Sequence, residues 1–423
     1  MHISRTCHRN TVSVLSVLAF LAALAIPLTH AATASAAPDG PPVGIKHSAQ
    51  ICPKPKPKQI TCDMRALTRA DGILLSTPGP SGGLTPLQLR SAYRLPYNAG
   101  KGQTVTLIEA GDDPTAEADL AVYRSQFGLP PCTVANGCFR KVNDTYQNGP
   151  LPPTANAIGM IETSLDMDAV SAACPQCNIV LVEANAALYG ADAMVFANYY
   201  AITTGGAKYL SNSWGGCEDS TELTVDFAFM NPGGAVTAAV GDFGYNTSPC
   251  PSPGPMYPAT SPYVVAVGET LLTPADNQRG WTESVSPSTG SGCSLVEPAP
   301  AWQQSLSQAA GCNGKRVTND IALAGDPNGG ALAVYVGYGI PPGWYTIGGT
   351  SEAAPIAAAM FAMAGQPAAQ GAASRLYGRP WAVNDITSGS NGTCTPAILC
   401  NAGPGWDGPS GVGSPTSLAL FNP

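Results

Sequence analysis

The chain has 423 residues, enough for about two or three average domains or for one large α/β domain with additions. Only 11% of the residues are charged and 44% are hydrophobic, while 47 glycines and 40 prolines indicate many turns without the composition of a disordered chain. The net charge of −8, without any basic run, argues against nucleic-acid binding.

All four histidines lie near the N-terminus, at His2, His8, His30 and His47. A globular body formed by residues 48–423 therefore contains no imidazole base and no imidazole metal ligand. This excludes Ser-His-Asp hydrolases, Cys-His peptidases and His-ligated zinc enzymes.

Residues 1–36 have the pattern of a secretory signal peptide: a basic start, an apolar stretch over 11–28, and the small-residue site Ala34-Ser35-Ala36. An uncleaved membrane anchor is the alternative, because the apolar stretch is 18 residues long. Its internal serines and proline, together with the small-residue site, favour cleavage. We therefore expect a secreted, extracellular protein with no membrane attachment after cleavage.

Residues 37–83 are rich in Pro, Gly and Lys and show little periodic pattern. This composition predicts a linker or a short pro-segment. From residue 84 onward, apolar β-branched runs at 104–110, 178–184, 207–214, 235–242 and 263–269 alternate with helical patterns at 118–128, 158–173 and 191–203. Strands that are apolar on both faces and alternate with helices predict one doubly wound α/β domain over 84–423, a parallel sheet flanked by helices.

The cysteines are the next feature. Apart from Cys7, which precedes the apolar stretch, twelve of the 13 remain, and they fall into close pairs. In an oxidising compartment the simplest interpretation is six local disulfides: Cys52/Cys62, Cys132/Cys138, Cys174/Cys177, Cys217/Cys250, Cys293/Cys312 and Cys394/Cys400. A zinc site at Cys174-x-x-Cys177 is the alternative, although the chain has no second CxxC motif.

Three segments carry candidate chemistry. Ser351 follows Gly348-Gly349-Thr350 and precedes an Ala-rich helical run, so it is either an exposed nucleophile or an ordinary helix N-cap. Glu162 and Asp166 are spaced to share one helix face, where they form either a proton-sharing pair or a solvated acidic face. Asp242 ends a buried run, as a structural turn residue or, if protonated, as a hydrogen-bond donor to a developing oxyanion.

Taken together, these motifs resemble the sedolisins, or serine-carboxyl peptidases, which have a subtilisin-like fold. The resemblance covers most of 84–423 and rests on the E-x-x-x-D helix at 162–166, Gly241-Asp242 and the G-T-S-x-x-x-P motif at 349–355. Segments 211–215, 258–268, 385–392 and 402–415 are also similar to the family.

The resemblance implies that Ser351 is the nucleophile, Glu162 its base, Asp166 the residue that orients and shares a proton with Glu162, and Asp242 the oxyanion donor. It also suggests Glu109 and Trp214 as an outer hydrogen-bond network. Members usually carry a long folded pro-domain, whereas only about 47 to 60 residues separate the signal peptide from the body here, counted from the printed sequence.

The resemblance further implies one bound Ca²⁺ ion near the C-terminus, and hard oxygen ligands suit this ion. The implied ligands are the carboxylates of Asp385 and Asp407 and the carbonyls of Ile386, Gly403 and Gly405. A Gly-rich turn without metal is the alternative.

We therefore expect a monomeric, secreted endopeptidase that cleaves proteins or peptides through an acyl-enzyme on Ser351. Two alternatives remain, a catalytically silent secreted binding protein on the same fold and a disulfide-rich adhesion or matrix module. Because carboxyl groups must serve as both base and donor, we expect a bell-shaped rate profile centred at roughly pH 3–5.

Overall fold

The computed structural model describes residues 47–56, 59–80, 82–245, 250, 254–365 and 371–422. The expected signal peptide at 1–36 lies outside these residues. Within the described part, no helix is long and apolar enough to cross a membrane. All described residues belong to one compact unit, which spans Gly44–Pro423.

The core is an eight-stranded sheet whose main path runs β13-β12-β10-β8-β5-β7-β6, with β16 pairing β12. Every neighbouring pair is parallel except β12–β13. In register, Leu107 lies opposite Leu181 on one side and Ser211 on the other. The strands are β5 (Thr104–Ala110), β6 (Phe139–Asn143), β7 (Asn178–Ala184), β8 (Tyr209–Asn212), β10 (Ala235–Ala239), β12 (Val265–Pro274), β13 (Trp281–Val285) and β16 (Ile321–Ala324).

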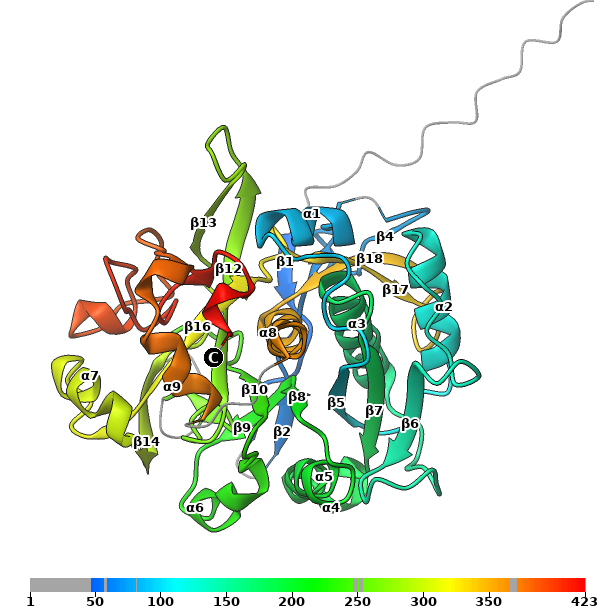
Figure 1. Cartoon of the computed structure of the whole chain (residues 1–423), viewed down its shortest axis with the longest axis horizontal. Helices are drawn as coiled ribbons and strands as arrows, with labels where there is room; N and C mark the ends of the chain where they lie inside the picture. Colours follow the sequence, from blue (N-terminus) through cyan, green and yellow to red (C-terminus); the bar gives the residue numbers. More distant parts are fainter. Residues whose placement is uncertain are drawn as a thin grey trace, which may run out of the picture. The chain divides into compact units, whose positions relative to one another are not determined.

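Helices cover both faces of this sheet (Figure 1). On one face, α3 (Ala157–Ala173) and α8 (Thr350–Ala364) pack together, and Leu107 and Leu181 join their core. On the other face, α5 (Ala191–Thr203) packs over Ile108 and Val182. Alternate residues of one strand thus enter two cores, which is why these strands are apolar on both faces. The predicted doubly wound α/β fold is confirmed.

A second sheet contains the start of the described chain. Its strands run β1-β3-β18-β17, with β4 also pairing β18, and every pair is antiparallel. They are β1 (His47–Gln50), β3 (Arg65–Thr68), β4 (Ser76–Thr77), β17 (Leu332–Val336) and β18 (Gly343–Gly348). Between β1 and β3, strand β2 (Ile60–Cys62) pairs with β9 (Trp214–Cys217), which also pairs with β11 (Met256–Tyr257).

These pairings differ from the expectation that 37–83 is a linker or short pro-segment with little structure. In its described part, the segment contributes four short strands to the body. Although β3 also pairs with the nearby β1, its other partner β18 and the partner of β2 lie more than a hundred residues further along the chain, so the local pattern carries no trace of them.

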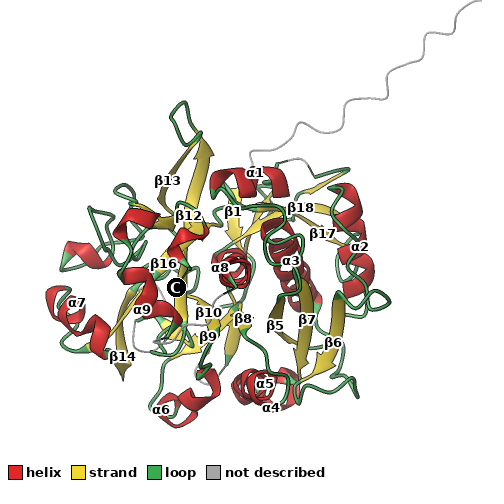
Figure 2. Ribbon diagram, viewed as in Figure 1, coloured by secondary structure: helices red, strands yellow, loops and turns green. Residues whose placement is uncertain are grey.

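The remaining elements surround the sheets (Figure 2). Two more strand pairs are β14 (Gly292–Pro298) with β15 (Lys315–Thr318) and β19 (Val383–Asn384) with β20 (Ser414–Pro415). The other α-helices are α1 (Pro86–Ala92), α2 (Ala116–Gln126), α4 (Ala186–Tyr189), α6 (Glu222–Val225), α7 (Gln304–Ala309) and α9 (Ala372–Tyr377). Short 3₁₀ helices span Asp226–Phe229, Ala301–Gln303, Pro380–Ala382, Ala397–Leu399 and Leu418–Leu420.

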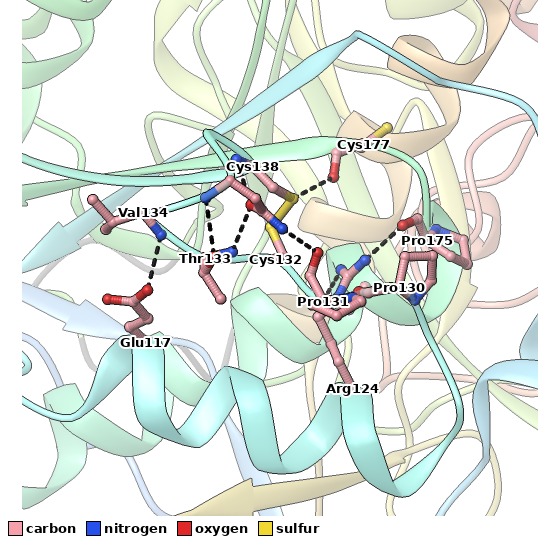
Figure 3. Close-up of a disulfide and its surroundings, with 12 residues drawn as sticks. Glu117, Arg124, Pro130, Pro131, Cys132, Thr133, Val134, Cys138, Pro175 and Cys177 are labelled. Atoms are coloured by element: carbon pink, nitrogen blue, oxygen red, sulfur yellow. Dashed lines mark hydrogen bonds between the residues drawn. A yellow bond between two sulfur atoms is a disulfide. The ribbon is translucent and has the colours of Figure 1, made fainter.

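All six predicted disulfides are present, in the predicted pairing. Figure 3 shows the Cys132–Cys138 bridge, which closes the loop between α2 and β6. The buried Arg124 joins this loop to the end of α3 by donating to the carbonyl of Pro130 at 2.6 Å and to that of Pro175 at 2.6 Å. These contacts fix the position of α3, the helix that carries Glu162 and Asp166.

Candidate active site

Ser351 lies at the start of α8, immediately after β18 and the turn at Gly349. Gly349 is the N-cap of this helix, so Ser351 is not, and its side chain is fully buried. Gly349 has φ +110°, and a Cβ there would lie 2.3 Å from the Asp63 carbonyl oxygen and 2.4 Å from Asp242 Oδ2. Only glycine allows the backbone to adopt this conformation and to come so close to both groups.

The serine hydroxyl has partners on two sides. Ser351 Oγ donates to the carbonyl of Ser213 at 3.2 Å and accepts from the N–H of Asp63 at 3.1 Å. In return, Ser213 Oγ shares its single proton between the Ser351 carbonyl, at 3.2 Å, and Asp166 Oδ2, at 2.8 Å. That carbonyl lacks its usual helical donor, because Pro355, four residues later, has no N–H. The Ser213 hydroxyl therefore replaces the hydrogen-bond donor that Pro355 lacks in the helix that carries Ser351.

Glu162 and Asp166 lie one turn apart on α3 and are 3% and 0% exposed, which rules out a solvated acidic face. Asp166 Oδ2 accepts from Ser213 Oγ at 2.8 Å, whereas no described donor bonds to either Glu162 oxygen. Burial raises the pKa of Glu162 well above its ordinary value and the Asp166 charge raises it further. The nearby Ser351 hydroxyl opposes this increase, although in this structure it donates to the Ser213 carbonyl. Burial also raises the pKa of Asp166, to about 7.

Glu109, near the end of β5, extends this pair into a group of three carboxyl groups. Burial raises the pKa of Glu109 well above its ordinary value, and the charges of Asp166 and Glu162 and a hydrogen bond to Asp166 add to the increase. Three interacting buried carboxyl groups hold their protons jointly rather than ionising independently. Trp214 does not join them through its indole nitrogen, which donates to Asn212 Oδ1 at 3.0 Å.

Asp242 follows β10 and is buried. Its Oδ1 accepts from the N–H and the hydroxyl of Thr350 at 2.8 Å and 2.9 Å, while Oδ2 has no described partner. Burial raises the pKa of Asp242 well above its ordinary value, and the charge of Asp63 raises it further. A protonated Oδ2 here is a hydrogen-bond donor available to an oxygen beside Gly349.

These residues assemble the parts needed for acyl transfer. The Ser351 N–H donates to the Asp63 carbonyl and the Ser351 hydroxyl accepts from the Asp63 N–H, while Asp242 Oδ2 and the Asp63 carbonyl oxygen flank Gly349. The Glu162 carboxyl group lies near the serine hydroxyl. A cavity of about 170 Å³ adjoins them and is lined by Glu109, Glu162, Ser213, Trp214 and strand β2. Nucleophilic attack on a carbonyl carbon at this position is the chemistry that the arrangement supports.

Two residues of this site are not evident from the sequence. Ser213 stands in the SNSWG segment, but nothing in that segment identifies its hydroxyl as the link between Asp166 and the helix of Ser351. Asp63 lies in the stretch interpreted as linker, where only the structure reveals its contacts. The third acid of α3, Asp168, faces away and accepts from the N–H of Tyr335 at 3.0 Å.

The C-terminal loop brings the five residues of the expected calcium site into one region. Asp385 accepts from the N–H of Gly405 at 3.0 Å, and the buried Asp407 accepts from the N–H of Gly403 at 2.9 Å. The pKa of Asp407 rises to about 6 through burial, and the neighbouring Asp385 charge contributes to the increase. No described donor bonds to the carbonyl oxygens of Gly403, Gly405 or Ile386. Two adjacent carboxylates and three carbonyls without partners fit a hard cation such as Ca²⁺.

Comparison with known proteins identifies relatives of this chain. No protein-family profile matches the chain. Over 373 residues it is 31% identical to kumamolisin from Bacillus sp. (strain MN-32), covering 80% of this chain and 63% of that protein. Over 353 residues it is 30% identical to sedolisin from Pseudomonas sp. (strain 101), covering 73% and 58%. The chain thus spans about three fifths of the length of these relatives.

A solved structure supports the same comparison. Pseudomonas sedolisin, a serine-carboxyl proteinase in complex with two molecules of pseudo-iodotyrostatin, superimposes with a TM-score of 0.66 at 25% identity. The match covers 80% of this chain and 96% of that one.

Proposed function

Because the chain belongs to the sedolisin family, we propose that it is a secreted serine-carboxyl endopeptidase that hydrolyses protein or peptide substrates at acidic pH. The observation that carries the proposal is the position of Ser351 between the Glu162–Asp166 pair and Asp242, with a carbonyl group held between the donors. Family membership without these residues would support only the fold.

Each residue has a role in the proposed reaction. Ser351 Oγ attacks the substrate carbonyl carbon, and Glu162 takes the hydroxyl proton and later gives it to the leaving amine. Asp166 shares a proton with Glu162 and thereby sets the ionisation state of Glu162. The Ser213 hydroxyl keeps Asp166 in place by a hydrogen bond. The Ser351 N–H and protonated Asp242 stabilise the developing oxyanion, a contribution of about 3–4 kcal/mol for one such donor in comparable enzymes. Water then hydrolyses the acyl-enzyme.

Acidic pH follows from these roles. Residues 48–423 contain no histidine, so carboxyl groups provide both the base and the neutral donor. Glu162 must be ionised while Asp242 is protonated, and ordinary carboxyl groups titrate near 4. Burial raises the pKa of both residues, which moves the working window upward from the ordinary carboxyl range. We expect the maximum to lie below pH 7.

We also propose one Ca²⁺ ion on the C-terminal loop, bound by Asp385, Asp407 and the carbonyls of Ile386, Gly403 and Gly405. An ion there would neutralise two adjacent carboxylates and stabilise the loop next to β16 and β20, and it takes no part in the proton transfers. The six disulfides support an extracellular location. We propose that the protein acts as a monomer on protein or peptide partners and binds no nucleic acid.

The test is hydrolysis of a denatured protein at pH 4 by the purified chain and by Ser351→Ala. The proposal expects cleavage by the first and none by the second, with equal melting temperatures. A folded chain that binds the denatured protein without cleaving it would instead support the catalytically silent binding protein.

A further inference from the structure

An extended piece of the chain lies in the candidate active site. Strand β2 pairs antiparallel with β9, the strand that follows Ser213, with Thr61 opposite Gly215 and Cys62 opposite Trp214. Addition of an extended peptide to a strand edge is a common way in which proteins bind peptides. Asp63, the residue after β2, therefore occupies the position of the substrate residue whose carbonyl group a serine peptidase attacks.

The contacts of Asp63 agree with this position. Its carbonyl oxygen accepts from the Ser351 N–H at 3.0 Å, and its own N–H donates to Ser351 Oγ at 3.1 Å. The same carbonyl oxygen and Asp242 Oδ2 flank Gly349. One proposed oxyanion donor, the Ser351 N–H, thus binds the carbonyl of the Asp63–Met64 bond, and the other, Asp242, lies beside the same glycine.

We propose that Ile60–Met64 is bound as a self-substrate and acts as a built-in inhibitor, which Ser351 cleaves at the Asp63–Met64 bond and which the Cys52–Cys62 disulfide retains in the cleft. This inference rests on the proposed peptidase function and adds the chain itself as a substrate.

The side chain of Asp63 occupies a closed pocket. It is fully buried, and its two oxygens lie 3.5 Å and 3.6 Å from where a Cβ would stand on Gly215 and Gly241. No described donor reaches either oxygen, and burial together with the charge of Glu269 raises the pKa of Asp63 well above its ordinary value. The pocket therefore accepts the neutral acid, and two glycines provide the space for it.

Both sides of the Asp63–Met64 bond are anchored. After the bond, β3 pairs with β18, Ala66 lying opposite Ile347. Before it, Cys62 is joined to Cys52, which follows β1 by two residues, and β1 pairs with β3, Gln50 lying opposite Arg65.

The two anchored sides also contact each other around the bond. The Met64 N–H donates to Cys52 Sγ at 3.2 Å, and the Ile51 N–H donates to the Met64 carbonyl at 3.2 Å. The disulfide lies over the base as well, since its sulfurs and a Glu162 oxygen are within 4.8 Å of one another. After cleavage, the new Asp63 carboxyl end stays attached through the disulfide to a strand that remains paired with the other fragment.

The step is an ordinary peptide hydrolysis. Ser351 Oγ bonds to the Asp63 carbonyl carbon, the C–N bond to Met64 breaks, and the Met64 amine leaves with the proton carried by Glu162. Water then splits the Asp63 ester and regenerates the serine hydroxyl. Because the Met64 amine stays close, it can also attack the Asp63 ester and re-form the original peptide bond. This reverse reaction slows the departure of the segment from the cleft.

Self-cleavage is tested first, on the full chain at pH 4. Mass spectrometry of the denatured, reduced sample should find a fragment that ends at Asp63 and another that begins at Met64, and neither in Ser351→Ala. The two fragments should elute together in native gel filtration. A chain that digests denatured protein but stays intact at Asp63–Met64 would overturn the self-substrate while leaving the peptidase function standing. If neither substrate is cut, the peptidase function itself fails.

Inhibition is tested with Cys52→Ser/Cys62→Ser, using Cys394→Ser/Cys400→Ser as the matched disulfide control. The first variant should hydrolyse a short fluorogenic peptide at least about tenfold faster at early times, because its inhibitory strand dissociates more readily. Thr61→Pro, which disrupts pairing with β9 without touching a cysteine, should act in the same direction if the disulfide variant does not fold. Initial rates equal to the control in both would overturn the inhibitory role.

Discussion

Ser351 and Asp63 are joined by two reciprocal hydrogen bonds: the Ser351 N–H donates to the Asp63 carbonyl at 3.0 Å, and the Asp63 N–H donates to Ser351 Oγ at 3.1 Å. The nucleophile candidate thus faces a peptide bond of its own chain. This relationship unites the two proposals, because the groups that hold the Asp63 carbonyl are those expected to hold the carbonyl of any other substrate.

The first prediction concerns the base. Glu162→Gln keeps the shape of the side chain but removes its ability to accept the Ser351 proton, so kcat should fall by about 10²–10⁴-fold with little change in KM. The matched control is Asp168→Asn, a buried acid on the same helix that contacts Tyr335 instead of the site. Steady-state kinetics on a peptide substrate would separate the two. Equal losses in both variants would indicate that α3 matters only structurally.

The second prediction concerns stability and pH. Carboxyl groups titrate near 4 in the unfolded chain, whereas burial raises the pKa of Asp119 to about 6, of Asp166 to about 7 and of Glu183 to about 8. Between these values the folded state binds more protons than the unfolded state. The free energy of unfolding should therefore be greatest near pH 4 and should fall as the pH rises to 8.

Urea denaturation of Ser351→Ala, which cannot digest itself, at pH 4, 6 and 8 provides the measurement. The midpoint concentration of urea should decrease in that order. A midpoint that increases with pH would mean that these carboxyl groups are ionised and stabilised in the folded protein.

The third prediction concerns a buried ion pair. Arg316 and Asp320 are 2.6 Å apart with both side chains fully buried, and Tyr377 also donates to Asp320. Arg316→Ala leaves the Asp320 carboxylate without its counter-charge and should cost about 3–5 kcal/mol of unfolding free energy. Arg69→Ala breaks an exposed pair with Asp71 and should cost less than about 1 kcal/mol in the same chemical denaturation experiment. Similar losses for both would contradict the prediction.

The fourth prediction concerns calcium. An ion that binds only the folded state adds about 2.7 kcal/mol at a hundredfold excess over its Kd, so a chelator should lower the melting temperature. Asp407→Asn should remove this sensitivity, whereas Asp192→Asn, at an exposed position on α5, should keep it. Differential scanning calorimetry with and without chelator decides the matter, and an unchanged melting temperature in the unmodified chain would count against the site.

Some of these features are readable from the sequence and others are not. The strands at 104–110 and 178–184 and the helix at 191–203 coincide with β5, β7 and α5, because each carries its whole pattern within a few residues. The disulfides were predictable because each joins two cysteines that follow one another along the chain.

Asp63 and the short strands around it were not predictable. Strand β2 has three residues and β3 has four, too few to show a period, and a Pro- and Lys-rich stretch precedes them. Their stability comes from β9 and β18, whose residues lie far along the chain. The role of Ser213 is equally nonlocal, since it depends on α3 and α8 meeting beside one loop.

The most direct test of the central claim is the pH–rate profile of peptide hydrolysis for the unmodified chain and for Asp242→Asn. We predict a bell-shaped profile with its maximum below pH 7 and above the ordinary carboxyl values near 4, since burial raises the pKa of Glu162 and of Asp242. Asparagine donates at every pH, so the variant should lose its alkaline limb or shift it upward, whatever rate it loses. A maximum above pH 7, or an identical alkaline limb in both proteins, would contradict the account.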